Sequence, residues 1–373
     1  MRLPWGTFPP VACPAVRIAI THPYCWPDVR RGAERIVVET ARALAARNHE
    51  VTVLTSGSHP GRYHDGGVRT IRLRRLFEDP WRHERSFGVR VAPYLAFGRF
   101  DVVHAMMVGD AYAAVRTRVI GRHRVVFDEM GIPYRWWYGE SHPEGRVRER
   151  LTREVDVYGC MSQHALDVLL DDWGRQGSLI PGGVRLSEFP IGVERTSRPT
   201  VLFSGALTEP RKGLVVLLEA VALLVASEPE LTVWLSGPGD PGPFLAAAPA
   251  AARRVVEVLP LGTPEEQGLR YGRAWVTALP SIADSFGLVL IESLASGTPI
   301  VVVDDAAPPS LVTPSTGAVA KPNDPVSLAE ALRLGLDLAR QPETAERCRQ
   351  FARQFDWDEH IAPLLEGLYR RNG

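Results

Sequence analysis

The sequence lacks several features that would restrict its function at once. Its 373 residues contain only four cysteines, Cys13, Cys25, Cys160 and Cys348, with no CxxC pair and no metal-ligand spacing. Such scattered cysteines argue against a disulfide framework and against a structural zinc site. The 43 basic and 43 acidic side chains give a formal net charge of zero. That balance argues against a general nucleic-acid-binding protein.

Long apolar runs are also lacking. None approaches the roughly 20 residues that cross a bilayer, and residues 1–14 are proline-rich rather than organised as a secretory signal. The sequence contains no internal repeat and no low-complexity tract. We therefore expect a cytoplasmic protein, with peripheral contact at the inner face of the membrane as an alternative.

The chain does contain a regular alternation of apolar, strand-like segments and helical segments, and it is long enough for two domains with separate cores. This alternation predicts α/β architecture with parallel sheets, in two Rossmann-like domains that face one another across a cleft. Ligands are then expected at the carboxyl ends of the strands. The expected strands cover residues 16–21, 51–55, 101–104, 125–127, 155–161, 179–184, 200–203, 231–235, 255–259, 274–279 and 300–303.

Two acids eight positions apart, Asp284 and Glu292, are the most informative feature. A helix is expected from Gly287 to Ser296, so Asp284 lies in the loop at its N-terminus, where free amides and the helix dipole favour an anion such as phosphate. Glu292 lies inside the helix among apolar residues, where a carboxylate is costly unless it is hydrogen-bonded, for example by ribose hydroxyls. The alternative is an amphipathic helix with an exposed Glu292 and a capping Asp284.

The segment from Asp284 to Pro299 resembles the acid-x7-acid signature of the retaining nucleotide-sugar glycosyltransferases of family 4, which have the GT-B fold. In that family the first acid contacts the donor sugar and the second holds the ribose. The resemblance therefore implies a catalytic role for Asp284, which is one methylene shorter than the commoner Glu, and donor binding by Glu292. It implies further donor contacts by Ser285, Phe286, Gly287, Leu288 and Val289.

The stretch from Gly205 to Gly213 resembles the Gly-Arg…Lys-Gly element that grips the donor diphosphate in this family. Lys212 matches the phosphate-binding lysine, and a lysine in such a loop is well placed to neutralise a pyrophosphate leaving group. A solvated loop charge is the alternative. Ala206 departs from the pattern, since the family usually has arginine there, and Arg211 is the residue that we expect to compensate.

Three weaker matches complete the implied donor site. Gly237 lies in a turn that resembles the family's Gly-x-Gly turn near the nucleotide, and Leu261 lies in a segment that resembles the one whose backbone contacts the base. Gly32 lies in a segment that resembles the Gly-Gly-Ala-Glu loop over donor and acceptor, with Arg31 in place of the first glycine. We predict a turn over 30–35, with a helix only from 36 to 46, and close backbone approach at Gly32.

Four residues of the first half are candidate acceptor or sugar contacts. Many relatives have a histidine just past the strand that matches 125–127, where this chain has Asp128, Glu129 and Met130. Either an acid has taken over that contact or the contact is missing. His104 also matches a family histidine, although a strand-end histidine satisfied by the backbone is an equal alternative.

The resemblance implies an N-terminal, acceptor-side domain over 15–195 and a donor-binding domain over 196–356, with the terminal helix, 357–373, packing back on the first. The expected function is retaining, metal-independent transfer of a hexosyl group from a UDP- or GDP-sugar to an acceptor hydroxyl, with the nucleotide sugar as co-substrate and no other cofactor. The alternative is a degenerate GT-B protein that binds a nucleotide or sugar without catalysis, which Ala206 and Met130 favour. A GT-B epimerase is a third possibility, for which we cannot place the acid and base.

The sequence indicates less about the acceptor than about the donor. Residues 62–99 carry nine arginines against four acids, interleaved with apolar side chains. This region is either a peripheral contact with an anionic membrane or a solvated surface. The aromatic run of Trp136, Trp137 and Tyr138 either stacks on a sugar or hydrophobic aglycone or belongs to the core. Arginine-rich, lysine-poor usage favours a bacterial source with GC-rich DNA, and hence a small-molecule, natural-product or envelope-glycan acceptor.

Overall fold

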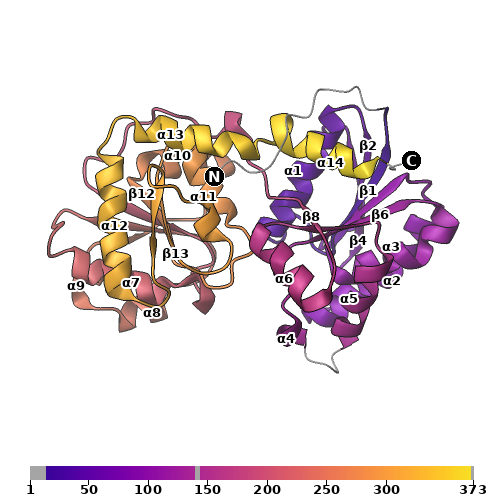
Figure 1. The fold of residues 1–373 in the computed structure, drawn as a ribbon, viewed down its shortest axis with the longest axis horizontal. Coiled ribbons are helices and arrows are strands. Elements are labelled where there is room, and N and C mark those ends of the chain that lie inside the picture. Colours follow the sequence, from indigo (N-terminus) through magenta and orange to yellow (C-terminus); the bar gives the residue numbers. More distant parts are fainter. Residues whose placement is uncertain (1–13, 139–142, 371–373) are drawn as a thin grey trace. The chain divides into compact units, whose positions relative to one another are not determined.

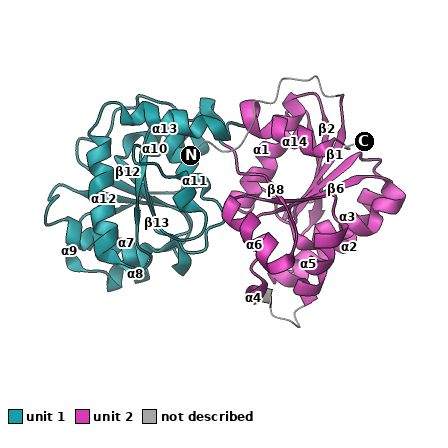
Figure 2. Ribbon diagram, viewed as in Figure 1, with its two compact units in different colours: residues 1–3, 184–356 teal, residues 4–183, 357–373 magenta. Residues whose placement is uncertain are grey.

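The computed structural model describes residues 14–138 and 143–370, which leaves the proline-rich start of the chain outside it. The chain divides into two compact units (Figure 2). Of the described residues, the C-terminal unit, unit 1 in the figure, contains Val184–Asp356, and the N-terminal unit, unit 2, contains those up to Gly183 together with those from Trp357 onward. Segment 184–195, which we expected in the N-terminal domain, therefore belongs to the C-terminal unit. Among the described residues, no helix is both long and apolar enough to cross a membrane.

The C-terminal unit is built on a six-stranded sheet in the order β11-β10-β9-β12-β13-β14, in which every neighbouring pair is parallel. The strands are β9 (Thr200–Ser204), β10 (Thr232–Ser236), β11 (Val256–Val258), β12 (Val276–Leu279), β13 (Ile300–Val303) and β14 (Gly317–Ala320). The chain proceeds outward from β9 in one direction and from β12 in the other. These two adjacent strands therefore form a topological switch point, where open α/β sheets bind ligands.

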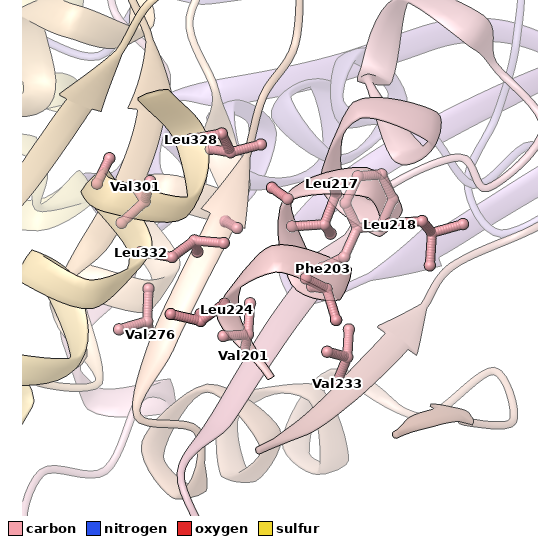
Figure 3. Close-up of a cluster of buried hydrophobic side chains, with 14 of the residues drawn as sticks. Val201, Phe203, Leu217, Leu218, Leu224, Val233, Val276, Val301, Leu328 and Leu332 are labelled. Carbon is pink, nitrogen blue, oxygen red and sulfur yellow. The ribbon is translucent and has the colours of Figure 1, made fainter. Parts of the chain in front are cut away.

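Two groups of helices accompany this sheet (Figure 1). Helices α7 (Leu214–Leu224), α9 (Ala250–Arg253) and α12 (Pro325–Ala339) form one packed group, and α10 (Pro264–Arg273), α11 (Leu288–Ala295) and α13 (Thr344–Ala352) form the other. The short helix α8 (Gly242–Ala247) follows β10. Apolar side chains of β9 and β12 meet those of α7 and α12 in a dry core, which includes Phe203, Val276, Leu217 and Leu332 (Figure 3). This burial fixes the strands from which the candidate site loops leave.

The N-terminal unit contains an eight-stranded sheet in the order β3-β4-β2-β1-β5-β6-β7-β8, parallel except for the β3–β4 hairpin. Its strands are β1 (Arg17–Thr21), β2 (Glu50–Gly57), β3 (Gly61–Asp65), β4 (Val68–Arg74), β5 (Val102–Ala105), β6 (Arg124–Glu129), β7 (Val157–Cys160) and β8 (Ser178–Leu179). Its helices before the C-terminal segment are α1 (Gly32–Ala46), α2 (Pro80–Phe97), α3 (Val108–Gly121), α4 (Arg135–Tyr138), α5 (Pro143–Glu154) and α6 (Gln163–Trp173). The two parallel-sheet α/β units confirm the expected fold class.

The C-terminal helix is joined to the N-terminal unit by buried polar contacts. A π-helical turn, Trp357–Ile361, leads into α14 (Ala362–Tyr369), which packs against α1 and β6. Arg47 donates to both carboxylate oxygens of Glu366, at 2.7 and 3.0 Å. Tyr369 and His104 are joined at 2.7 Å between the hydroxyl and Nδ1. Residues 371–373 of the expected terminal helix lie outside the described part.

Candidate functional site

The loops that follow β9, β10 and β12 are bonded to one another at one edge of the C-terminal sheet. The backbone N–H of Gly205 donates to the carbonyl of Ser236 at 3.0 Å, which joins the first loop to the end of β10. The N–H of Ile282 donates to the carbonyl of Arg211 at 2.8 Å, which joins the first loop to the one after β12. The expected donor-site residues on these loops therefore gather at the switch point of the sheet.

Two glycines allow these loops to approach so closely. Gly213 has a φ of 76°, and a Cβ there would lie 2.1 Å from the carbonyl oxygen of Pro280. Gly237 has a φ of 152°, and a Cβ there would lie 1.8 Å from the carbonyl oxygen of Gly205. Both the backbone conformation and the space exclude a side chain. The two predicted glycine positions, Gly205 and Gly237, thus face one another directly.

The two predicted catalytic residues form an ion pair. Lys212 ends the 3₁₀ turn Pro210–Lys212, and its Nζ lies 2.6 Å from Oδ2 of Asp284 in the loop before α11. Their side chains are only 16% and 10% exposed. Burial by itself would raise the pKa of Asp284, but the charge and hydrogen bond of Lys212, with smaller contributions from Arg211 and the Phe286 N–H, lower it below its ordinary value. Asp284 is therefore ionised at neutral pH.

Glu292 is buried in α11, with 5% exposure, so the alternative of an exposed glutamate is wrong. The hydroxyl of Tyr271 in α10 donates to its Oε2 at 2.9 Å. The same hydroxyl lies 3.0 Å from the hydroxyl of Ser204, the last residue of β9. Burial and the nearby Glu292 carboxylate raise the pKa of Tyr271 well above its ordinary value, so the phenol stays protonated and donates.

The loop between Asp284 and α11 is held by one buried ring. Phe286 is 4% exposed and packs edge-on against Phe355, with ring centroids 5.6 Å apart. Gly287 precedes the helix with a φ of 95°. The first amides of a helix have no acceptor within it, which makes this N-terminus suited to an anion. The neighbouring loop and first-turn side chains are half-buried: Ser285, Leu288 and Val289.

The other two expected donor contacts, Arg211 and Leu261, make no direct contact with the Lys212–Asp284 pair. Arg211 forms a close ion pair with Glu209 and reaches the carbonyl of Ala283 at 3.5 Å. Leu261 lies in the coil after β11, with 57% exposure. Both are at the carboxyl edge of the sheet, but neither joins the Lys212–Asp284 pair directly.

Sequence reasoning missed a hydrogen-bond network that extends from Ser204 to Arg270. Gln267 Nε2 donates to Ser204 Oγ at 3.2 Å, and Ser236 Oγ donates to Gln267 Oε1 at 2.9 Å. Arg270 Nη1 donates to Ser236 Oγ at 3.1 Å. Two signals could have indicated it. Serine ends both β9 and β10, and residues 267, 270 and 271 share the helix spacing of one face.

In the N-terminal unit, the expected turn over 30–35 is wrong, because α1 begins at Gly32. Arg31 takes the extended conformation of an N-cap, and its guanidinium lies 2.5 Å from Glu34 in the first turn. An acid in the first turn is favoured by the helix dipole. The predicted donor contact Gly32 is therefore the first residue of a helix.

Three of the four candidate acceptor residues, His104, Asp128 and Glu129, contact side chains of their own unit. His104 and Asp128 are both buried, with His104 Nε2 3.6 Å from Asp128 Oδ2, and burial raises the pKa of Asp128. Glu129 forms a close ion pair with the buried Arg148 and accepts from Tyr158 at 3.2 Å. In the structure these polar groups contact other protein side chains. Their expected contacts with a sugar stay predictions.

Met130, the remaining candidate contact, is half-buried and follows β6. Residues 62–99 form the β3–β4 hairpin and α2. Leu76 and Phe77 are 50% and 40% exposed, whereas Phe87 is fully buried. Trp136 and Trp137 are 68% and 48% exposed, so the core alternative is wrong for these two rings, while the side chain of Tyr138 lies outside the described part.

Within residues 14–138 and 143–370, no group of three or more histidine, cysteine, aspartate or glutamate side chains is placed to hold a metal ion.

Known proteins resemble this chain over both units. The family model for group 1 glycosyl transferases matches residues 185–355, and the model for Glycosyltransferase Family 4 matches residues 30–188. A phosphatidyl-myo-inositol mannosyltransferase from Propionibacterium freudenreichii is 32% identical over 306 residues, which cover 76% of this chain and 74% of that protein.

Solved structures show the same fold. Sucrose-phosphate synthase from Thermosynechococcus elongatus superposes with a TM-score of 0.78 at 22% identity, covering 95% of this chain and 98% of its own. The Anabaena protein HepE, solved in complex with UDP-glucose, superposes with a TM-score of 0.74 at 16% identity, covering 94% of this chain and 100% of its own. From these matches, the chain belongs to glycosyltransferase family 4 and has the GT-B fold.

Proposed function

We propose that this glycosyltransferase moves a hexosyl group, with retention, from a nucleotide-diphosphate sugar to an acceptor hydroxyl. The observation that carries this proposal is the buried Lys212–Asp284 pair, 2.6 Å long, at the switch point of the C-terminal sheet. A cation and an ionised carboxylate held together at a helix N-terminus suit a substrate with a departing diphosphate and a hydroxylated sugar.

Each residue has a distinct role in this proposal. Lys212 and the first amides of α11 stabilise the negative charge that develops on the leaving diphosphate. Asp284 orients the donor sugar through its hydroxyls, and Glu292 accepts hydrogen bonds from the ribose. The acceptor hydroxyl attacks the anomeric carbon from the face that the diphosphate leaves. The bond from that carbon to the diphosphate oxygen breaks as the bond to the acceptor oxygen forms, and the hydroxyl proton passes to the leaving diphosphate. The positive charge comes from the protein, so we propose a metal-independent reaction.

The relatives suggest the donor and acceptor to test first. The Propionibacterium relative is described as a phosphatidyl-myo-inositol mannosyltransferase. We therefore propose a mannosyl donor as the first candidate and an inositol-bearing lipid as the first acceptor candidate, alongside the UDP-sugars suggested by the complex of HepE with UDP-glucose. Small-molecule and envelope-glycan acceptors remain in the panel.

The test is turnover with UDP- and GDP-sugars against an acceptor panel, measured by release of the nucleoside diphosphate. We expect release from one donor class, accelerated by an acceptor, and a product whose anomeric configuration by NMR matches that of the donor. An inverted product would exclude the retaining mechanism. Binding without any release would instead support the alternative of a degenerate GT-B protein, which Ala206 and the engagement of Glu129 by Arg148 favour.

Residues 62–99 are the candidate membrane contact if the acceptor is a lipid. Leu76 and Phe77 are exposed directly after Arg74 and Arg75, a combination suited to an anionic bilayer surface. Flotation with anionic vesicles tests this idea. We expect Leu76→Ser/Phe77→Ser to float less than wild type, while Leu334→Ser, at an exposed position of α12 outside residues 62–99, floats normally. Equal flotation of all three proteins would leave a solvated surface as the better description.

A further inference from the structure

One position of the donor site lacks its expected cation. Ala206 stands where the resemblance implies an arginine that shares the diphosphate with Lys212. A diphosphate carries more negative charge than one lysine neutralises, and the loss of one preorganised donor at a leaving group costs about a hundredfold or more in kcat. Either the site works with one cation or another residue supplies the second.

Arg211 is badly placed to be that residue. Its guanidinium forms a close ion pair with Glu209 and approaches the carbonyl of Ala283 at 3.5 Å. Its side chain is 42% exposed. A guanidinium that already has a carboxylate partner and partial solvation gains less from a phosphate than one without a counter-ion.

Arg270 is better placed than Arg211 to bind a phosphate. Its Nη1 donates to Ser236 Oγ at 3.1 Å and to Gln267 Oε1 at 3.4 Å, both neutral acceptors. Within residues 14–138 and 143–370, no ion pair joins its guanidinium to a carboxylate, although Glu266 Oε2 also lies near Gly262. Arg270 is also half-buried in α10, so its charge is only partly solvated. A half-buried arginine that contacts only neutral groups favours an anionic ligand.

The contacts of Ser236 connect Arg270 with the position of the missing arginine. The side chain of Ser236 holds Arg270, while its carbonyl accepts the N–H of Gly205, the residue before Ala206. A Cβ at Gly262 would lie 3.0 Å from Oε2 of Glu266 and 3.1 Å from Nη1 of Arg270, so the absence of a side chain at Gly262 leaves room for both groups. Gln267, one turn earlier, and Tyr271, the next residue, tie the same helix to Ser204 at the end of β9.

We propose that Arg270 binds the diphosphate of the nucleotide-sugar donor and supplies the cation that is missing at Ala206. This inference rests on the proposed function, because it requires a donor with a diphosphate. The planar guanidinium offers paired N–H groups to phosphate oxygens. Ser236 and Gln267 hold it in place before the donor arrives, which reduces the entropy lost on binding.

The test is calorimetric binding of UDP, UMP and uridine, or of GDP, GMP and guanosine, to Arg270→Met and to the matched control Arg273→Met. Arg273 is an exposed arginine of the same helix. We expect Arg270→Met to weaken diphosphate binding by about tenfold to a hundredfold, as for a lost hydrogen bond to a charged group. Nucleoside binding should change by less than about threefold, and Arg273→Met should match wild type.

A second-site variant sharpens the test. If Arg270 substitutes for the missing arginine, Ala206→Arg/Arg270→Met should recover most of the lost diphosphate affinity. Equal weakening of nucleoside and diphosphate, or no weakening at all, would overturn the inference while the proposed function stands. Failure of wild type to bind any nucleotide would remove the proposed function and this inference together. Circular dichroism of Arg270→Met confirms that the comparison is made between folded proteins.

Discussion

At the scale of single residues, a lysine is held against a carboxylate in surroundings where both are largely buried. Lys212 is one of only two lysines in the chain, the other being Lys321. Asp284 keeps its negative charge because Lys212 outweighs the cost of burial. In the absence of donor, each charge is therefore the partner of the other. In the proposed reaction, the donor would bring a diphosphate to Lys212 and sugar hydroxyls to Asp284.

Replacement of Lys212 should remove transition-state stabilisation without changing the fold. We expect Lys212→Met to lower kcat by about 10²–10³-fold, the usual cost of one lost donor at a developing negative charge. The control is Lys321→Met, because Lys321 is exposed and its side chain takes no part in the site. Nucleoside diphosphate release measures both. Equal rates for the two variants would contradict the assigned role of Lys212.

A second residue-scale prediction concerns Asp110 in the first turn of α3. Asp110 is 1% exposed, and burial raises its pKa to about 8 from an ordinary 3.8, although hydrogen bonds from Thr21 and the backbone oppose the shift. Between about pH 4 and 8 the unfolded chain has lost this proton while the folded chain keeps it. The native state is therefore progressively disfavoured as pH rises through that window.

Asp110→Asn cannot titrate, so its free energy of unfolding should rise relative to wild type from about pH 4 to 8 and then level off. Urea denaturation at several pH values measures this. Asp101→Asn is the control of opposite sign, since the hydrogen bonds of Arg17 lower the pKa of Asp101. In wild type, ionised Asp101 stabilises the folded state above its ordinary pKa, and this stabilisation is lost as pH falls through the lowered pKa of the folded state. A flat difference for Asp110→Asn would contradict the prediction.

At the scale of elements, the loop that carries Lys212 depends on one glycine. Gly213 and Gly192 have nearly the same φ, 76° and 77°, but a Cβ at Gly213 would lie 2.1 Å from Pro280 O, whereas nothing lies within 4 Å of one at Gly192. Gly192→Ala should cost about 1 kcal/mol of backbone strain. Gly213→Ala should cost clearly more and should also weaken nucleotide binding. Thermal unfolding measures the stability of the two variants. Equal losses of stability would show that the loop can shift to relieve the clash with Pro280.

The C-terminal helix provides a pH-dependent test at the same scale. Burial would raise the pKa of Glu366, but Arg47 and His49 together lower it. Its stabilising contribution is thus full above the ordinary pKa and disappears as pH falls through the lowered one. We expect Glu366→Gln to lose about 1–3 kcal/mol at pH 7 and much less at low pH, while Glu230→Gln, at an exposed position, loses nothing. A loss that does not depend on pH would contradict the ion pair.

Elements were predictable where apolar periodicity was strong. Buried strands such as β9 and β13 of the C-terminal sheet appear in the sequence as short apolar runs. The β3–β4 hairpin was missed because its strands are arginine-rich and β3 is wholly exposed. The short β14 was missed because it consists only of glycine, alanine and valine. The helical start at Gly32 was missed because the pairing of Arg31 with Glu34 depends on local geometry.

At the scale of the whole molecule, the candidate residues of the C-terminal unit were more predictable than those of the N-terminal unit. The loops of the C-terminal unit carry residues whose chemistry is visible in their type and spacing, such as Lys212, Asp284 and Glu292. In the N-terminal unit, the ion pairs of the charged candidates could not be predicted from sequence spacing. Glu129, for example, pairs with Arg148, which is distant in the sequence. Arg270 was missed for the same reason, since its contact with Ser236 at the end of β10 arises only in the folded structure.

The measurement that tests the donor site most directly is calorimetric titration with UDP and GDP of wild type, Glu292→Gln and Tyr271→Phe. Glutamine keeps an acceptor for Tyr271 but removes the charge, whereas Tyr271→Phe removes the hydroxyl and leaves the carboxylate. We expect one nucleotide to bind with a micromolar Kd, about tenfold to a hundredfold weaker in Glu292→Gln and nearly unchanged in Tyr271→Phe. Equal loss in both variants, or no binding of either nucleotide to wild type, would contradict a ribose-binding Glu292 and the donor site built around it.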